Sequence, residues 1–343
     1  MTRQSWFRPA SITCLTAFAG CNHPLDPSSS RTTQNTVQTT HPAGTVVATT
    51  PLGGQPYGLA INGAGDLLVA QVFADSVTRF ALPGTTPVHA TFFGIPEATD
   101  SGQYFEGTGT VHLAINPAGT TAYVIEQFGN TVREFDLASN HITATIPLTN
   151  SGYNIIVSKD GRRVYASTED GRLYVIATAT RSIVDSMAIG PAANGFTFSP
   201  DGSVLYASSR DAATITVFRT SDDAQVATYA VGGRPQRLAM APDGTRLYAA
   251  NEDSGLSVVD LTTGAVLPPV NPIHSGYGLG ITPDGAQLYL TNPATGEVAI
   301  IDRATLGTVS VVTVRGVPRN VAFSADGTLG VVTDGDGRVI FIQ

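Results

Sequence analysis

The sequence predicts an all-β fold built from seven similar sheets, and three observations support this prediction. A turn followed by an apolar strand recurs seven times, with turn glycines at Gly65, Gly119, Gly161, Gly202, Gly244, Gly285 and Gly327. Successive glycines are 54, 42, 41, 42, 41 and 42 residues apart, a period typical of propeller blades. Hydrophobic residues make up 42% of the chain, which is enough for a large core. We therefore expect a seven-bladed β-propeller of four-stranded antiparallel blades.

The N-terminal segment has the features of an export signal. Residues 1–8 are basic and lack acidic side chains, and residues 10–20 are apolar but too short to span a bilayer as a helix. The segment ends in Phe-Ala-Gly-Cys, which resembles a bacterial lipobox with phenylalanine where aliphatic residues are usual. We expect cleavage after residue 20 and a lipid on Cys21, which implies an exported protein of the bacterial cell envelope, held in the outer membrane or facing the periplasm. Ordinary signal cleavage and no export are the alternatives.

The segment that follows the signal is expected to be a flexible tether. Residues 21–44 are rich in serine, threonine, proline and asparagine and show almost no apolar periodicity. Such a composition cannot bury enough apolar surface to order the chain. The propeller is therefore expected to span residues 45–343 as a monomer held at the membrane by its lipid.

Each repeat is expected to supply four strands, named A to D from the centre of the ring outwards. In the fifth repeat, strand A covers residues 235–241, and the Pro-Asp-Gly turn at 242–244 reverses the chain because glycine accepts the positive φ that the turn requires. Strands B and C cover residues 247–250 and 256–260, and strand D begins at residue 265.

The two ends of the chain are predicted to meet in one blade. The last repeat supplies strands A, B and C at residues 320–323, 329–333 and 338–342, and then the chain ends. A spare strand at residues 45–50 precedes the first repeat. We expect this N-terminal strand to complete the seventh blade, because closure of the ring removes sheet edges that would otherwise aggregate.

The B strands carry a family resemblance. Tyr248-Ala249-Ala250-Asn251 and Tyr289-Leu290-Thr291-Asn292 resemble the YVTN-type β-propeller repeat, and the other repeats carry weaker copies. The resemblance covers about residues 45–343 and implies a seven-bladed envelope or surface protein. Related seven-bladed families include lactonases and an antibiotic lyase, and no motif in this sequence selects either.

Polar and aromatic residues gather where the A strands begin, at the predicted funnel on the face that also carries the B–C loops. Eight positions before the turn glycines stand Tyr57, Val111, Tyr153, Asn194, Gln236, Tyr277 and Arg319, and seven positions before stand Gly58, His112, Asn154, Gly195, Arg237, Gly278 and Asn320. The ends of the B strands add Glu126 and Asp334. From these rows and ends we selected ten candidate ligand-binding residues: Tyr57, His112, Glu126, Tyr153, Asn154, Gln236, Arg237, Tyr277, Arg319 and Asp334. The alternative is that polar strand ends simply meet water.

The first two turn glycines enclose an insertion of about 12 residues, within residues 93–110. It carries Glu97, Tyr104, Phe105 and Glu106 on the predicted funnel face. We interpret it as a lid or a partner contact, with a tolerated surface insertion as the alternative.

Charge and motif content exclude several functions. The net charge of −8 and the lack of a basic face disfavour nucleic-acid binding. The histidines are scattered, and the sequence lacks zinc-site, serine-elbow and dinucleotide motifs, so we expect no metal and no cofactor. Residues 334–337 resemble the start of a calcium loop, but an arginine follows where an oxygen ligand belongs. A central calcium ion held by Glu126 and Asp334 stays an alternative.

These observations favour a non-enzymatic envelope propeller that binds a small molecule or a protein partner at its funnel. The alternative is an envelope hydrolase, lactonase or lyase that acts on a small polar molecule and uses His112 with Glu126 and an arginine.

Overall fold

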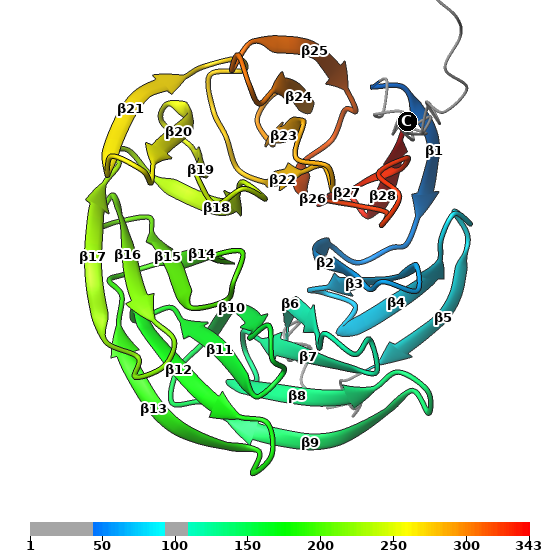
Figure 1. The fold of residues 1–343 in the computed structure, drawn as a ribbon. Helices are drawn as coiled ribbons and strands as arrows, with labels where there is room; N and C mark the ends of the chain where they lie inside the picture. Colours follow the sequence, from blue (N-terminus) through cyan, green and yellow to red (C-terminus); the bar gives the residue numbers. More distant parts are fainter. Residues whose placement is uncertain (1–43, 93–108) are drawn as a thin grey trace, which may run out of the picture. The chain divides into compact units, whose positions relative to one another are not determined.

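The computed structural model describes residues 44–92 and 109–343, and it shows seven four-stranded antiparallel sheets arranged around a central axis (Figure 1). The first blade contains β2 (Pro56–Ile61), β3 (Asp66–Gln71), β4 (Ser76–Ala81) and β5 (Pro87–Phe92). The second contains β6 (Thr110–Ile115), β7 (Thr121–Glu126), β8 (Thr131–Asp136) and β9 (His141–Pro147). The third contains β10 (Gly152–Val157), β11 (Arg163–Thr168), β12 (Arg172–Ala177) and β13 (Ser182–Ala188).

The remaining blades repeat this order. The fourth contains β14 (Ala193–Phe198), β15 (Val204–Ser209), β16 (Thr214–Arg219) and β17 (Gln225–Ala230), and the fifth contains β18 (Pro235–Met240), β19 (Arg246–Asn251), β20 (Gly255–Asp260) and β21 (Ala265–Val270). The sixth contains β22 (Leu279–Ile281), β23 (Gln287–Asn292), β24 (Glu297–Asp302) and β25 (Thr308–Thr313). The seventh contains β26 (Pro318–Phe323), β27 (Gly330–Asp334), β28 (Arg338–Ile342) and β1 (Val46–Pro51). The predicted seven-bladed fold is confirmed.

The N-terminal strand closes the ring, as the sequence predicted. Strand β1 pairs antiparallel with β28, and Thr49 lies opposite Ile340. Beyond the strands, the backbone N–H of Thr45 donates to the carbonyl of Gln343 over 2.6 Å. In Figure 1, β1 in blue lies beside β28 in red. The two ends of the folded domain therefore share one sheet, in which β1 covers the edge that β28 would otherwise expose.

Aromatic side chains help to hold neighbouring blades together. Tyr289 of the sixth blade is fully buried, and its ring centre lies 4.8 Å from that of Phe323 in the seventh blade, edge to face. Phe80 and Phe341 make a similar contact at 5.9 Å between the first and seventh blades. Such edge-to-face pairs stabilise by about 1 kcal/mol beyond the area that they bury.

The A–B turns form a second set of contacts between blades. Gly244 has a φ of 71°, and a Cβ added there would lie 3.3 Å from Pro200 of the preceding blade. Gly285 meets Pro242 in the same way, and Gly327 meets a proline of the sixth blade. The equivalent position in the last blade is Ala325, so this junction lacks the proline ring.

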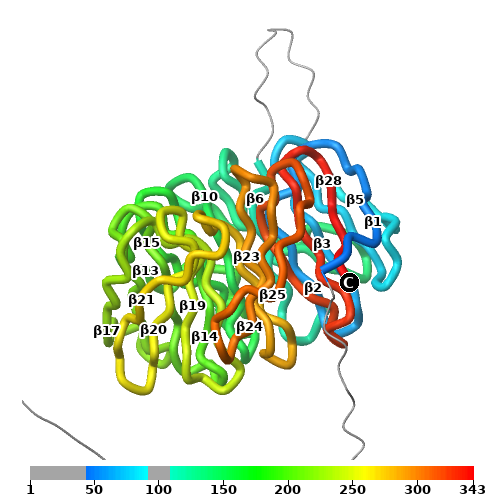
Figure 2. The backbone as a smooth tube through the Cα atoms, turned by 90° about the horizontal axis from the view of Figure 1, so that it is seen from above, coloured from blue at the N-terminus to red at the C-terminus, as the bar shows by residue number. Residues whose placement is uncertain are grey.

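Two faces can be distinguished. The top face carries the D-to-A connections and the B–C loops, and the bottom face carries the A–B and C–D turns; in Figure 2 the strands run between these two faces. Each A strand therefore runs from the top face to the bottom face along the central channel. Within residues 44–92 and 109–343, the structure contains no helix with the length and apolar character that a membrane span requires.

Candidate functional site in the central channel

Equivalent positions of the seven A strands form rings around the channel, and the ring seven positions before the turn glycines contains only glycines and polar residues. Three of its members are glycines, because neighbouring backbone lies too close for a side chain. A Cβ added to Gly278 would lie 1.9 Å from the carbonyl oxygen of Arg319, and one added to Gly195 would lie 2.1 Å from that of Gln236. The other four members are His112, Asn154, Arg237 and Asn320. We call these four residues the polar ring.

Arg237 connects the polar ring across the channel. Its Nε–H donates to Oδ1 of Asn320 over 2.8 Å, and its two terminal nitrogens hydrogen-bond the carbonyl oxygen of Asn194 and Nε2 of His112. Asn154 also donates to the Asn194 carbonyl. Arg237 is only 7% exposed, and no ion pair within residues 44–92 and 109–343 includes it. The structure thus buries a guanidinium among neutral acceptors.

His112 is neutral in this setting. Burial lowers its pKa well below the usual 6.5, and the charge of Arg237 lowers the pKa further. A guanidinium only donates hydrogen bonds, so Nε2 of His112 accepts and the ring proton resides on Nδ1. The edge of the Tyr57 ring packs on the imidazole with 5.2 Å between ring centres.

An aromatic layer stands above the polar ring, one residue closer to the top face. The hydroxyls of Tyr57 and Tyr277 hydrogen-bond each other, and the guanidinium carbon of Arg319 lies 5.6 and 5.1 Å from the centres of their rings. Burial raises the pKa of Tyr57 well above 10, and that of Tyr153 is raised for the same reason. These phenols stay protonated at neutral pH, so they act as hydrogen-bonding groups and not as bases.

A cavity of about 160 Å³ lies at the polar ring and beneath it. All four members of the polar ring line it. The rest of its wall is apolar: one residue from each blade, Leu59, Leu113, Ile155, Phe196, Leu238, Leu279 and Val321, together with Ile156. The cavity therefore has a cationic polar end and an apolar end.

Glu126 and Asp334 are not among the residues that line this cavity. Glu126 is fully buried in its blade, where it forms an ion pair of 2.7 Å with Arg133. Asp334 accepts the backbone N–H of Val317 over 2.7 Å and pairs with Arg338. Both carboxylates pair with an arginine of their own blade, and Glu126 does not line the cavity that His112 lines.

The equivalent residues of other blades explain this placement. Asn251 donates to the carbonyl of Gly232 over 2.9 Å, and Asn292 donates to that of Ile273 over 2.7 Å. Gln71 does the same in the first blade with Gly53. The polar residue at the end of each of these B strands thus fastens the incoming connection of its blade, which is a structural task.

The structure separates the predicted residues into groups. His112, Asn154 and Arg237 form the polar ring with Asn320, and Tyr57, Tyr277 and Arg319 form the aromatic layer. Gln236 is turned toward Glu252, to which its amide donates. The predicted lid residues Glu97, Tyr104, Phe105 and Glu106, and the predicted lipid acceptor Cys21, lie outside the described residues.

Sequence reasoning missed Asn194 and Asn320 as site residues. Asn320 stands at the same spacing from its turn glycine as His112 and Arg237, so the register contained the signal. Asn194 is fully buried, and neither polar atom of its side chain has a hydrogen-bond partner. Its contribution through a backbone carbonyl could not be foreseen from residue type.

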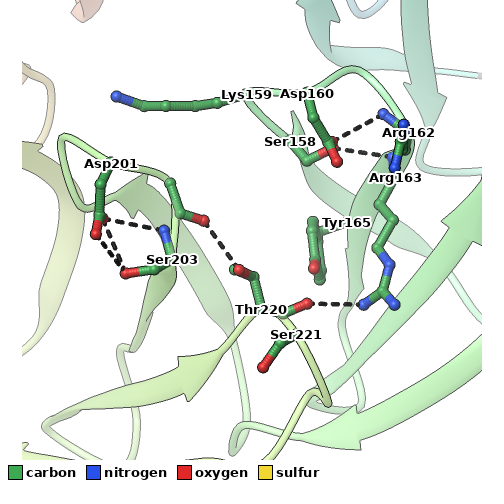
Figure 3. A pocket seen from close by; sticks show the side chains of 11 residues that line it. Ser158, Lys159, Asp160, Arg162, Arg163, Tyr165, Asp201, Ser203, Thr220 and Ser221 are labelled. Atoms are coloured by element: carbon green, nitrogen blue, oxygen red, sulfur yellow. Dashed lines mark hydrogen bonds between the residues drawn. The ribbon is translucent and has the colours of Figure 1, made fainter.

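A second pocket, of about 420 Å³, lies on the bottom face between the third and fourth blades (Figure 3). Two of the charged side chains in its wall are already engaged, and Arg162 is exposed to solvent. Asp201 accepts from Ser203 over 2.8 Å, and Arg163 donates to the carbonyl of Thr220 and pairs with Asp223 at 2.7 Å. The channel is the stronger candidate, because Arg237 is buried there and no described residue forms an ion pair with it.

The described part of the chain contains no group of three or more histidine, cysteine, aspartate or glutamate side chains placed to hold a metal ion. Glu126 and Asp334 in particular are each occupied by an arginine.

Comparison with known families gives one match: the model of the family described as "Lactonase, 7-bladed beta-propeller" matches residues 64–278. No curated protein matches this sequence.

Proposed function

We propose that this chain, which belongs to the lactonase seven-bladed β-propeller family, binds a small carboxylate-bearing molecule inside the central channel. The observation that carries this proposal is the buried Arg237, whose partners among the described residues are all neutral acceptors. Burying an unpaired charge costs several kcal/mol, and a bound carboxylate would compensate it. Guanidinium and carboxylate form short, paired hydrogen bonds that suit such a site.

The capacity of Arg237 for further bonds supports this proposal. A guanidinium has five N–H donors, and three hydrogen bonds from Arg237 to neighbouring residues are described above. The cavity beneath the polar ring has room for a carboxylate, and its wall contains no acidic side chain that would repel one. The ligand is thus placed within the channel, below the aromatic layer, and not on the open top face.

The test is calorimetric titration with acetate and butanoate. We expect saturable binding by the wild type and its loss in Arg237→Gln, with unchanged binding in Arg79→Gln, a control in which a partly buried arginine paired with Asp66 is removed from the first blade. Equal binding by wild type and Arg237→Gln would overturn the proposal.

A second candidate is hydrolysis of a lactone, which the family match and the neutral His112 favour. Water would add to the lactone carbonyl, the ring C–O bond would break, and the product would be a hydroxy carboxylate with one proton released. A neutral imidazole can accept a proton from water, and Arg237 can polarise the carbonyl. Nε2 of His112 already accepts a hydrogen bond from Arg237, however, and no described carboxylate orients the imidazole. We therefore rank ligand binding above hydrolysis.

Proton release in a pH-stat separates these candidates. Wild-type turnover of γ- and δ-lactones that His112→Gln abolishes, while acetate binding persists, would establish the hydrolase. Binding without turnover would leave the channel as a receptor.

We also propose where the protein is located and which repeat family its blades derive from. The lipobox-like sequence before Cys21 supports a lipid-anchored envelope protein, and the Tyr-x-x-Asn strands support a YVTN-type origin of the repeats. Mass spectrometry of the mature N-terminus tests the anchor, which an unmodified start at another residue would exclude.

A further inference from the structure

The lower half of the channel is lined by apolar side chains although it contains space. Below the polar ring, the next three rings of A-strand residues are apolar with one exception, Thr197. Another cavity, of about 600 Å³, opens there, and its wall includes Ile115, Phe198, Met240 and Pro242. We call it the lower cavity and the one at the polar ring the upper cavity. Apolar surface around open space is unfavourable in water, so a concave surface of this kind marks a binding site.

The two cavities lie end to end. Ile156 lines both of them. Strand β14 supplies Phe196 to the upper cavity and Phe198 to the lower one, and strand β18 supplies Leu238 and Met240 in the same way. A strand rises about 3.3 Å per residue, so Met240 lies about 10 Å below Arg237. We call these two neighbouring cavities together the shaft; Arg237 lies at its inner end, and most of the side chains that line it toward the bottom face are apolar.

Few charged side chains line the two cavities. No acidic side chain of the described residues lines either cavity. Among those residues, the one charged side chain in the wall of the lower cavity is Lys159, which is exposed and donates to the carbonyl of Pro200 over 2.8 Å. Above the polar ring, the Tyr57–Tyr277 pair and Arg319 stand over the shaft, whereas most side chains that line it below the ring are apolar.

We propose that the ligand of the channel is an amphipathic carboxylate, an acyl chain with a carboxyl head, which enters from the bottom face, places its head at Arg237 and lays its chain along Ile156 and Met240. This inference rests on the proposed function for its head group, and it adds the class of ligand, its orientation and its route of entry. A purely polar acid would leave the apolar wall exposed to water, and a neutral lipid would leave the charge of Arg237 uncompensated.

The test is a series of straight-chain carboxylates of increasing length, from acetate to decanoate, titrated into the full chain, with the alcohol of each length as the neutral counterpart. Each methylene that enters the shaft is expected to raise affinity by up to about fourfold. Arg237→Gln is expected to remove the preference for acid over alcohol. Lys159→Gln is expected to have little effect.

The shaft itself is tested by Met240→Gln, which keeps the length of the side chain but makes it polar. We expect it to weaken octanoate binding several-fold and to leave acetate binding unchanged. Met187→Gln is the matched control, because Met187 is equally buried in strand β13, away from the channel. Thermal unfolding of both variants shows whether they fold.

The outcomes are distinguishable. Arg237-dependent binding of acetate with no gain in longer acids would overturn the amphipathic ligand and keep the proposed function. Binding of octanoate that Lys159→Gln abolishes and Arg237→Gln does not would overturn the orientation. If no carboxylate of any length bound, both proposals would be wrong.

Discussion

The neutral, buried His112 predicts a specific pH dependence of stability. Burial and Arg237 hold its pKa well below 6.5 in the folded state, whereas the unfolded chain has the ordinary value. Between these two values the unfolded state binds more protons than the folded state, so stability rises with pH. The stabilisation is fully present above pH 6.5 and is lost as the pH falls below it.

The size of the effect follows from the linkage relation. Each pH unit below 6.5 costs up to about 1.4 kcal/mol until the folded pKa is reached. His112→Gln keeps an acceptor for Arg237 but cannot titrate, so it is expected to lose this slope. Urea unfolding followed by circular dichroism from pH 7.5 to 5 measures the difference between the two proteins, in which all other titrating groups cancel. Parallel pH profiles would refute the burial argument.

Three further predictions concern the stability and closure of the propeller. Gly278→Ala is expected to destabilise by at least about 2 kcal/mol, because its Cβ would meet a carbonyl oxygen at 1.9 Å, while Gly63→Ala, with no atom within 4 Å, serves as the control in chemical unfolding. Ala325→Pro is expected to stabilise by about 0.4–1 kcal/mol, because it restores the turn proline found in other blades and restricts the unfolded chain; a lower melting temperature would contradict this. Deletion of β1 is expected to expose β28 as an edge and cause self-association visible by light scattering, and a stable monomer would show that closure is dispensable.

The candidate site was only half predictable. The spacing from each turn glycine identifies His112 and Arg237 as neighbours of the channel, because strand A has a fixed rise and direction. It does not reveal that these two residues, 125 positions apart, contact each other, or that no described residue forms an ion pair with the guanidinium. The pairing of Glu126 was hidden for the same reason: its register is that of a loop end, and only the structure shows that Arg133 on the next strand of its own hairpin pairs with it.

The sequence by itself determined the number of blades, the positions of the turns and the closing strand, because turn chemistry and strand periodicity are local and repeat seven times. Only the tertiary structure decided what the channel contains. The closure of the ring sets how near the A strands approach each other, and this distance determines that glycines fill three positions of one ring while four polar side chains meet across it. The largely apolar shaft below that ring follows from the same geometry, since each blade supplies one apolar residue to the wall of the upper cavity, directly below the ring.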